Sequence, residues 1–123
     1  MRDDELQVVI NSYLEAFHQR DLAACAGFFT DNAKIHFVMG VHQGRQAIEE
    51  WHKDRFAADV RVTRLEGVRV EGETVSVDAV ATSKAIRAWR LGELAGTATF
   101  SLRDGKIETA SFDLRTTFPI EGW

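Results

Sequence analysis

Apolar residues recur at three- and four-residue spacing through the first half of the chain, the pattern of amphipathic helices. The first run predicts a helix over about residues 4–19, with Leu6, Val9, Ile10, Tyr13, Leu14 and Phe17 on one face. Asp3 or Asp4 can cap its start, and Asp21 can cap a second helix. The apolar stripe of that second helix holds Leu22, Cys25, Ala26 and Phe29. After Gly44, a third helix carries Ile48, Trp51, His52, Arg55 and Phe56 along one side.

Beyond residue 59 the period drops to two, which is typical of strands with one buried face. We expect strands over residues 59–70, 74–89, 94–103 and 106–116, separated by turns that contain glycine. A short strand over residues 33–39 precedes the third helix, and Gly40 turns it. Strands joined by short turns form an antiparallel meander. Helices followed by strands therefore predict a single α+β domain over residues 1–123.

The last hairpin allows two registers. A two-residue turn at Asp104-Gly105 pairs Leu102 with Ile107, and regular alternation from there mixes apolar and polar residues on both faces. A three-residue turn, with Gly105 as a left-handed bulge, pairs Leu102 with Lys106 instead. It places Leu94, Ala98, Phe100, Leu102, Ala110, Phe112 and Leu114 on one face. Because the buried face fixes the register, we predict the three-residue turn.

Composition and charge narrow the class of protein. The hydrophobic fraction of 45% is that of a globular domain, and no apolar run approaches the roughly 18 residues that a membrane span needs. The net charge of −4 argues against a nucleic-acid partner. The start of the chain, Met1–Glu5, is acidic on balance and does not resemble a secretory signal, and the single cysteine, Cys25, excludes an internal disulfide. We therefore expect a cytoplasmic protein with no nucleic-acid, membrane or cofactor partner.

Five short runs of sequence carry a resemblance to a known family. They are Tyr13–Phe17, Arg20–Leu22, Phe28–Ala33, Gly44–Ile48 and Asp104–Ile107. In this order and spacing the chain resembles the SnoaL-like, ketosteroid-isomerase-like branch of the nuclear-transport-factor-2 (NTF2) superfamily. The resemblance implies a cone in which three N-terminal helices pack on a strongly curved mixed or antiparallel sheet that encloses a pocket. It also implies a homodimer joined through the outer face of the sheet.

The resemblance says more about shape than about chemistry. Steroid isomerases of this branch use a tyrosine on the first helix, a carboxylate base on the first strand and a second carboxylic acid on a late strand. Tyr13 falls on the tyrosine position, but Phe37 and Ala98 fall on the two acid positions, so the steroid-isomerase mechanism is not expected. A further pocket tyrosine of those enzymes, bonded to the first, falls on His52.

A row of small residues lies on the predicted inner face of the sheet. Because interiors are close-packed, small side chains across a strongly curved sheet either draw the helices in or leave a cavity. The row comprises Ala79, Ala81, Ser83, Ala85, Ala98 and Ala110. Together with Ala98 and Ala110, the larger residues Phe37, Met39, Trp51, Phe56, Phe100 and Phe112 are the candidate pocket residues. Such a pocket suits a small apolar metabolite bearing a carbonyl or a hydroxyl group.

Tyr13 and His52 are the candidate catalytic residues. Each lies on the apolar stripe of a helix, where a polar group left unpaired is costly, so each is either a satisfied core residue or a functional one. We predict that the Tyr13 hydroxyl and the His52 ring lie within hydrogen-bond reach of each other at the polar end of the pocket.

Other polar residues point to chemistry less strongly. His36 and His42 flank Gly40, but no carboxylate or cysteine has matching spacing, so no metal site is predicted. Asp78 and Asp113 alternate with apolar residues and are expected on the solvated outer face of the sheet, and whether they reach the pocket stays open. Cys25 is expected to be a small core residue.

Three functions are consistent with these patterns. The first is an enzyme that transfers a proton in an isomerase, cyclase or dehydratase reaction, with Tyr13 as the electrophile and His52 as the acid or base. The second is a protein that binds a ligand without catalysis, and the third is a dimerisation module. The missing carboxylates weigh against the first function, and two polar groups on apolar stripes weigh against the third. The patterns therefore favour a small-molecule pocket and leave catalysis open.

Overall fold

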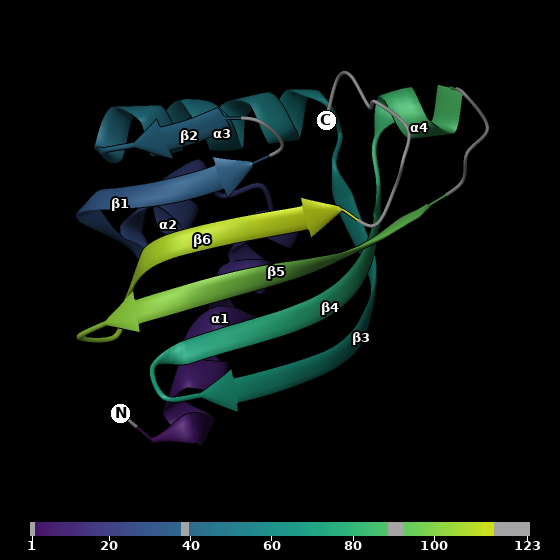
Figure 1. Cartoon of the computed structure of the whole chain (residues 1–123). Coiled ribbons are helices and arrows are strands. Elements are labelled where there is room, and N and C mark those ends of the chain that lie inside the picture. The colour runs from purple at the N-terminus through teal and green to yellow at the C-terminus, as the bar shows by residue number, and fades with distance from the viewer. Residues whose placement is uncertain (1, 38–39, 89–92, 115–123) are drawn as a thin grey trace.

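Four helices and one six-stranded sheet make up the computed structural model, which describes residues 2–37, 40–88 and 93–114 (Figure 1). The helices are α1 (Asp3–His18), α2 (Leu22–Gly27), α3 (Arg45–Ala57) and α4 (Lys84–Ala88). The strands are β1 (Phe29–Phe37), β2 (Gly40–Gln43), β3 (Arg61–Glu71), β4 (Thr74–Thr82), β5 (Leu94–Arg103) and β6 (Lys106–Leu114). The predicted α+β class is confirmed.

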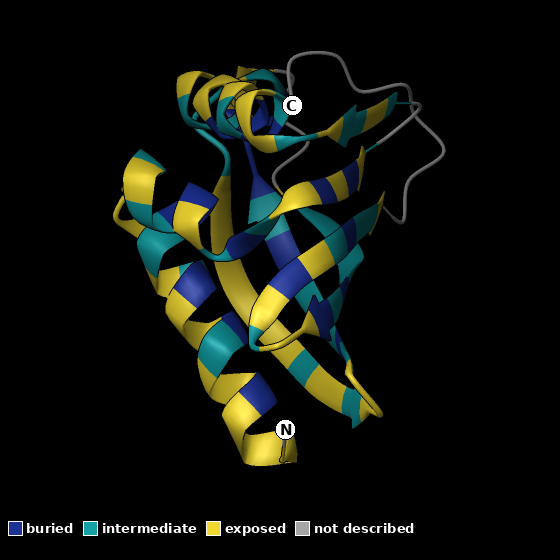
Figure 2. Cartoon of the chain, turned by 90° about the vertical axis from the view of Figure 1, so that its left-hand side faces the viewer, coloured by how far each residue is buried: buried dark blue, intermediate teal, exposed yellow. Residues whose placement is uncertain are grey.

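The sheet is mixed, in the order β2-β1-β6-β5-β4-β3. β1 runs parallel to β6, and every other neighbouring pair is antiparallel. The sheet curves without closing, and α1 crosses its concave face against β3 and β4, while α3 packs against β1 and β2 (Figure 1). Figure 2 shows the buried positions of the helices on the sides that face the sheet. The core therefore lies between the helix layer and the concave face.

The start of each helix tests the predicted caps. The Asp21 side chain accepts a hydrogen bond from the backbone N–H of Ala24 at 3.1 Å, so this predicted N-cap is confirmed. Neither Asp3 nor Asp4 caps α1, because Arg2 occupies the N-cap position and makes no side-chain cap bond. The two aspartates lie instead in the first helical turn, where the helix dipole favours negative charge.

For the last hairpin the predicted three-residue turn is wrong, but the predicted inner and outer faces of its two strands are right. The turn has two residues, Asp104 and Gly105, with φ of 52° and 79°, and Leu102 pairs with Ile107. Such a turn matches the twist of the flanking strands. The alternation is restored further along, because Ser101 pairs with Thr109 and leaves Glu108 as a bulge. The bulge keeps the apolar side chains of both strands on the concave face.

Three elements differ from the sequence prediction, and the first is β1, which begins at Phe29, a residue expected on the second helix, rather than at residue 33. The strand expected over residues 74–89 ends at Thr82 and is followed by α4. The Ser83 hydroxyl accepts a hydrogen bond from the Ile86 backbone N–H at 3.4 Å, which favours a helical turn, and Ile86 is buried. Ser83 and Ala85 therefore do not belong to the sheet face. Gly40, expected to be a turn residue, begins the short strand β2.

Candidate functional site

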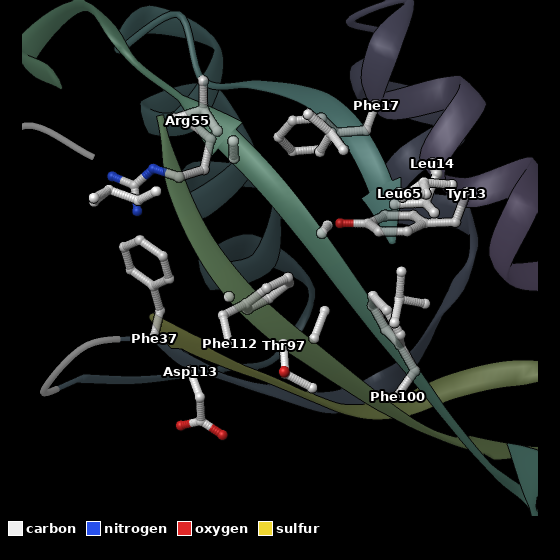
Figure 3. Close-up of a pocket in the computed structure, with 18 of the residues that line it drawn as sticks. Tyr13, Leu14, Phe17, Phe37, Arg55, Leu65, Thr97, Phe100, Phe112 and Asp113 are labelled. Atoms are coloured by element: carbon white, nitrogen blue, oxygen red, sulfur yellow. The ribbon is translucent and has the colours of Figure 1, made fainter. Parts of the chain in front are cut away.

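A cavity lies between α1, α3 and the concave face of the sheet (Figure 3). Its volume is about 100 Å³. Apolar residues form most of the lining: Leu14, Phe17, Phe37, Trp51, Val60, Val62, Leu65, Val77, Ala79, Ala81, Leu94, Gly96, Ala98, Phe100 and Phe112. Among the described residues, four with polar side chains also border it, Tyr13, Arg55, Thr97 and Asp113. For comparison, an apolar cavity of about 150 Å³ in another protein binds benzene.

Small residues on the sheet create this space. Ala79, Ala81, Gly96 and Ala98 face the cavity from β4 and β5, where larger side chains would fill it. A surface groove of about 450 Å³ between α1 and the start of β3 shares Leu14, Phe17, Val60, Val62 and Leu65 with the cavity. Leu65 is 48% exposed, so the lining meets solvent on this side.

The predicted pocket residues divide into three groups. The structure places Phe37, Trp51, Ala98, Phe100 and Phe112 in the lining, where Trp51 stacks on Phe112 with ring centroids 5.1 Å apart. Ala110 and Phe56 do not line the cavity. Ala110 is fully buried in the core, and Phe56 packs edge-on against Phe17. Met39 lies outside the described residues.

Tyr13 and His52 form the predicted hydrogen bond. The Tyr13 hydroxyl oxygen lies 2.8 Å from His52 Nε2, and His52 Nδ1 lies 2.7 Å from the backbone carbonyl of Ile48. Because a carbonyl oxygen only accepts, Nδ1 carries the imidazole proton and Nε2 accepts the hydrogen bond from the Tyr13 hydroxyl. The hydroxyl proton is therefore committed to His52.

Burial keeps both members of this pair neutral. His52 is 0% exposed, and burial lowers its pKa to about 4. Burial also raises the pKa of Tyr13 well above its ordinary value, with a smaller contribution from Cys25. Tyr13 lines the cavity, whereas His52 lies behind it, outside the lining. What the pair offers to the cavity is the hydroxyl oxygen of Tyr13, whose lone pairs can accept a hydrogen bond.

Arg55 is a further candidate residue, and in the sequence it is one member of the stripe predicted along the third helix. Its guanidinium lies 4.6 Å from the centroid of the Phe37 ring and 5.4 Å from that of Trp51 (Figure 3). Burial lowers its pKa from the ordinary arginine value. A signal was present in the sequence: arginine occupies a stripe position one turn after Trp51, among apolar residues.

The carboxylates do not enter the cavity. Asp78 lies on the outer face, where it binds Arg69 and accepts a hydrogen bond from Thr97 at 2.7 Å. Asp113 pairs with Thr97 across the strands and borders the cavity, but Figure 3 shows its carboxylate pointing away from Tyr13 and Arg55. Among the residues that line the cavity in the described ranges, none offers a carboxylate base to its interior.

The remaining candidates lie apart from the cavity. His36 is exposed and pairs with Val41, while His42 pairs with Ile35, so the two histidines are on opposite faces of the β1–β2 ladder. Within the described part of the chain, no three His, Cys, Asp or Glu side chains are grouped as metal ligands. Cys25 is buried, and burial together with Asp21 raises the pKa of its thiol to about 12.

A family model, the SnoaL-like domain, matches residues 10–110. The chain belongs to the SnoaL-like domain family. No helix of the described residues is long and apolar enough to cross a membrane. No curated protein matches the chain.

Solved structures share the fold of this SnoaL-like domain at low identity. The epoxide hydrolase/cyclase-like enzyme SalBIII, from pyran ring formation in the polyether salinomycin, has a TM-score of 0.81 at 23% identity, over 95% of this chain and 96% of its own. A candidate polyketide cyclase from Sinorhizobium meliloti has a TM-score of 0.76 at 23% identity, covering 85% and 93%. A de novo designed protein with a curved β-sheet has a TM-score of 0.76 at 14% identity, covering 96% and 91%. Since a designed protein shares the fold, the function must be argued from the cavity.

Proposed function

We propose that this SnoaL-like domain binds a small, largely apolar molecule in its cavity, and that the Tyr13 hydroxyl oxygen accepts a hydrogen bond from a hydroxyl group of that molecule. One observation carries the proposal: the hydrogen bond from Tyr13 to His52 Nε2 commits the phenol proton and leaves its oxygen as an acceptor. An acceptor in an apolar lining selects a ligand with a donor, because an unmatched polar group is costly to bury.

The lining supports an apolar ligand body. Aromatic rings from five different elements, including Phe37, Phe100 and Phe112, face the space, and the small residues of β4 and β5 leave it unfilled. Pockets with mostly apolar walls and a few placed polar groups are typical of small-molecule sites.

Proton-transfer chemistry is the second candidate, and the relatives favour it. SalBIII is named as an epoxide hydrolase/cyclase-like enzyme. In this chain, however, the Tyr13–His52 hydrogen-bond chain ends at the Ile48 carbonyl, and His52 is fully buried. Isomerase, cyclase or dehydratase chemistry would require the ligand to draw the Tyr13 hydroxyl away from His52. Binding without catalysis needs no such change, and we place it first.

The proposal is tested by titrating the protein with 1-hexanol and following the bound alcohol by ligand-observed NMR. We expect saturable binding that Ala98→Phe abolishes, because the new ring occupies the cavity. Ala23→Phe, on the exposed side of α2, is the matched control and should bind as the parent does. Equal binding by Ala98→Phe and the parent, or no saturable binding by the parent, would overturn the proposal.

A further inference from the structure

Two residues that line the cavity carry buried hydrogen-bond donors without a partner. Arg55 Nε and Trp51 Nε1 are both buried, and neither has a hydrogen-bond partner among the residues that the structure describes. The two residues lie one helical turn apart on α3, and both line the cavity. Buried donors without partners are rare, and each therefore calls for an explanation.

Arg55 also differs from the other arginines in its ionic contacts. Every other arginine of the described residues pairs with a carboxylate: Arg2, Arg20, Arg45, Arg61, Arg64, Arg69, Arg87 and Arg103. In the same ranges no carboxylate lies within ion-pair distance of Arg55. Its contacts are aromatic, with Phe37 and Trp51 beside the guanidinium.

Packing on these rings holds the arginine in place without neutralising its charge. Cation–π contacts fix the plane of a guanidinium and leave its N–H donors available. Arg55 is half-buried as a residue and its Nε is buried, and a cation partly removed from water attracts an anion more strongly than an exposed one does. A planar carboxylate matches the guanidinium fork, and the buried Trp51 indole N–H, one helical turn away on α3, is a second and neutral donor.

We propose that the ligand of this cavity is an apolar carboxylic acid whose carboxylate pairs with Arg55 and accepts a hydrogen bond from Trp51 Nε1. The inference rests on the proposed function and narrows its substrate class. Figure 3 shows Arg55 and Tyr13 on opposite sides of the cavity. The ligand therefore has its carboxylate at one end and its hydroxyl group toward the other, with an apolar body between them. A phosphate dianion is less well matched, since one cation and one neutral donor face it.

The experiment compares two probes of equal chain length, hexanoate and 1-hexanol, at pH 7 by ligand-observed NMR. We expect the parent to bind hexanoate at least tenfold more tightly than 1-hexanol, since charge-assisted hydrogen bonds are about twice as strong as neutral ones. Arg55→Met keeps an unbranched apolar stem against Phe37 and Trp51 and should lose this preference while it still binds 1-hexanol. Arg103→Gln removes an exposed arginine of the β5–β6 hairpin and should retain the preference, which controls for net charge.

The outcomes separate this inference from the proposed function. If the parent binds 1-hexanol as tightly as hexanoate, or Arg55→Met keeps the preference, the carboxylate assignment is wrong and the pocket stands. If the parent binds neither probe, both are wrong. If Arg55→Met does not fold, Arg55→Lys replaces it. That variant keeps the charge and loses the fork, and it should reduce the preference for hexanoate without abolishing it.

Discussion

The Tyr13 hydroxyl donates its hydrogen bond to His52 Nε2 over 2.8 Å, and the Ile48 carbonyl fixes that direction from the far side of the imidazole. Tyr13 comes from α1 and His52 from α3, so the bond also joins the two helices that flank the cavity. The arrangement turns a residue that commonly donates into an acceptor at the cavity wall. The direction of this hydrogen bond is the reason that we propose a ligand with a hydroxyl donor at Tyr13.

Removal of the hydroxyl should cost stability. In Tyr13→Phe the Nε2 of His52 loses its partner inside the core, and an unsatisfied buried acceptor costs about 1–3 kcal/mol. We expect the free energy of unfolding in urea to fall by about that amount, with the fold retained. The double variant Tyr13→Phe/His52→Leu removes both polar groups and should recover part of the loss. A loss that is strictly additive would show that the two side chains are not coupled.

The neutral state of His52 makes stability depend on pH. Its pKa is about 4 in the folded chain and about 6.5 when unfolded. Between these values the unfolded chain binds the extra proton and the folded chain does not. Stability contributed by neutral His52 is therefore fully present above pH 6.5 and is lost as pH falls toward 4. From these pKa values, we expect about 2 kcal/mol less stability at pH 5 than at pH 7.

The control for this pH dependence is His52→Gln, compared with the parent by urea unfolding at both pH values. It removes the titrating group, so the difference between pH 5 and pH 7 should shrink by about the same amount. A parent protein whose stability is equal at the two values, or a variant that keeps the full difference, would contradict a buried neutral His52.

Because of the cavity, we expect replacement of two alanines of the sheet by phenylalanine to change the free energy of unfolding by different amounts. Ala98 faces the empty space, so Ala98→Phe should change the free energy of unfolding by less than about 1 kcal/mol. Ala110 is fully buried in packed core, where overpacking costs about 1–3 kcal/mol or more, so Ala110→Phe should destabilise clearly. Thermal or urea unfolding measures both. Equal, large losses would mean that no space exists beside Ala98.

We expect a homodimer joined through the outer face of the sheet. Small, partly buried polar residues cover that face on β5 and β6, among them Thr97, Thr99 and Ser111. Light scattering at micromolar concentration should give twice the chain mass of 13.8 kDa. Thr99→Arg, which adds charge to the centre of the face, should shift the mass toward that of one chain. A parent protein that runs as a monomer would reject this interface.

The sequence predicted elements better where a single period runs without interruption. Helices α1 and α3 follow from apolar spacing, and the same spacing placed Tyr13 and His52 on stripes that meet. The turn of the last hairpin was predicted wrongly because Glu108 forms a bulge, which shifts the alternation of inner and outer residues partway along β6. A prediction that assumes unbroken alternation places this shift in the turn instead. The helix α4 was missed because Ser83 and Ala85 continue the alternation of the preceding strand, so the pattern does not mark the end of β4 at Thr82. Arg55 was missed because its isolation depends on which carboxylates lie nearby in space.

The claim that the Tyr13 oxygen accepts a hydrogen bond from the ligand is tested most directly by comparing 1-hexanol with methyl pentyl ether. The ether has the same number of heavy atoms and no hydroxyl donor. Dissociation constants of both are measured for the parent and for Tyr13→Phe by ligand-observed NMR. One neutral hydrogen bond corresponds to roughly a three- to tenfold preference for the alcohol in the parent, and Tyr13→Phe should lose that preference. A parent that binds the ether as tightly as the alcohol, or a Tyr13→Phe variant that still prefers the alcohol by the same factor, would contradict the account.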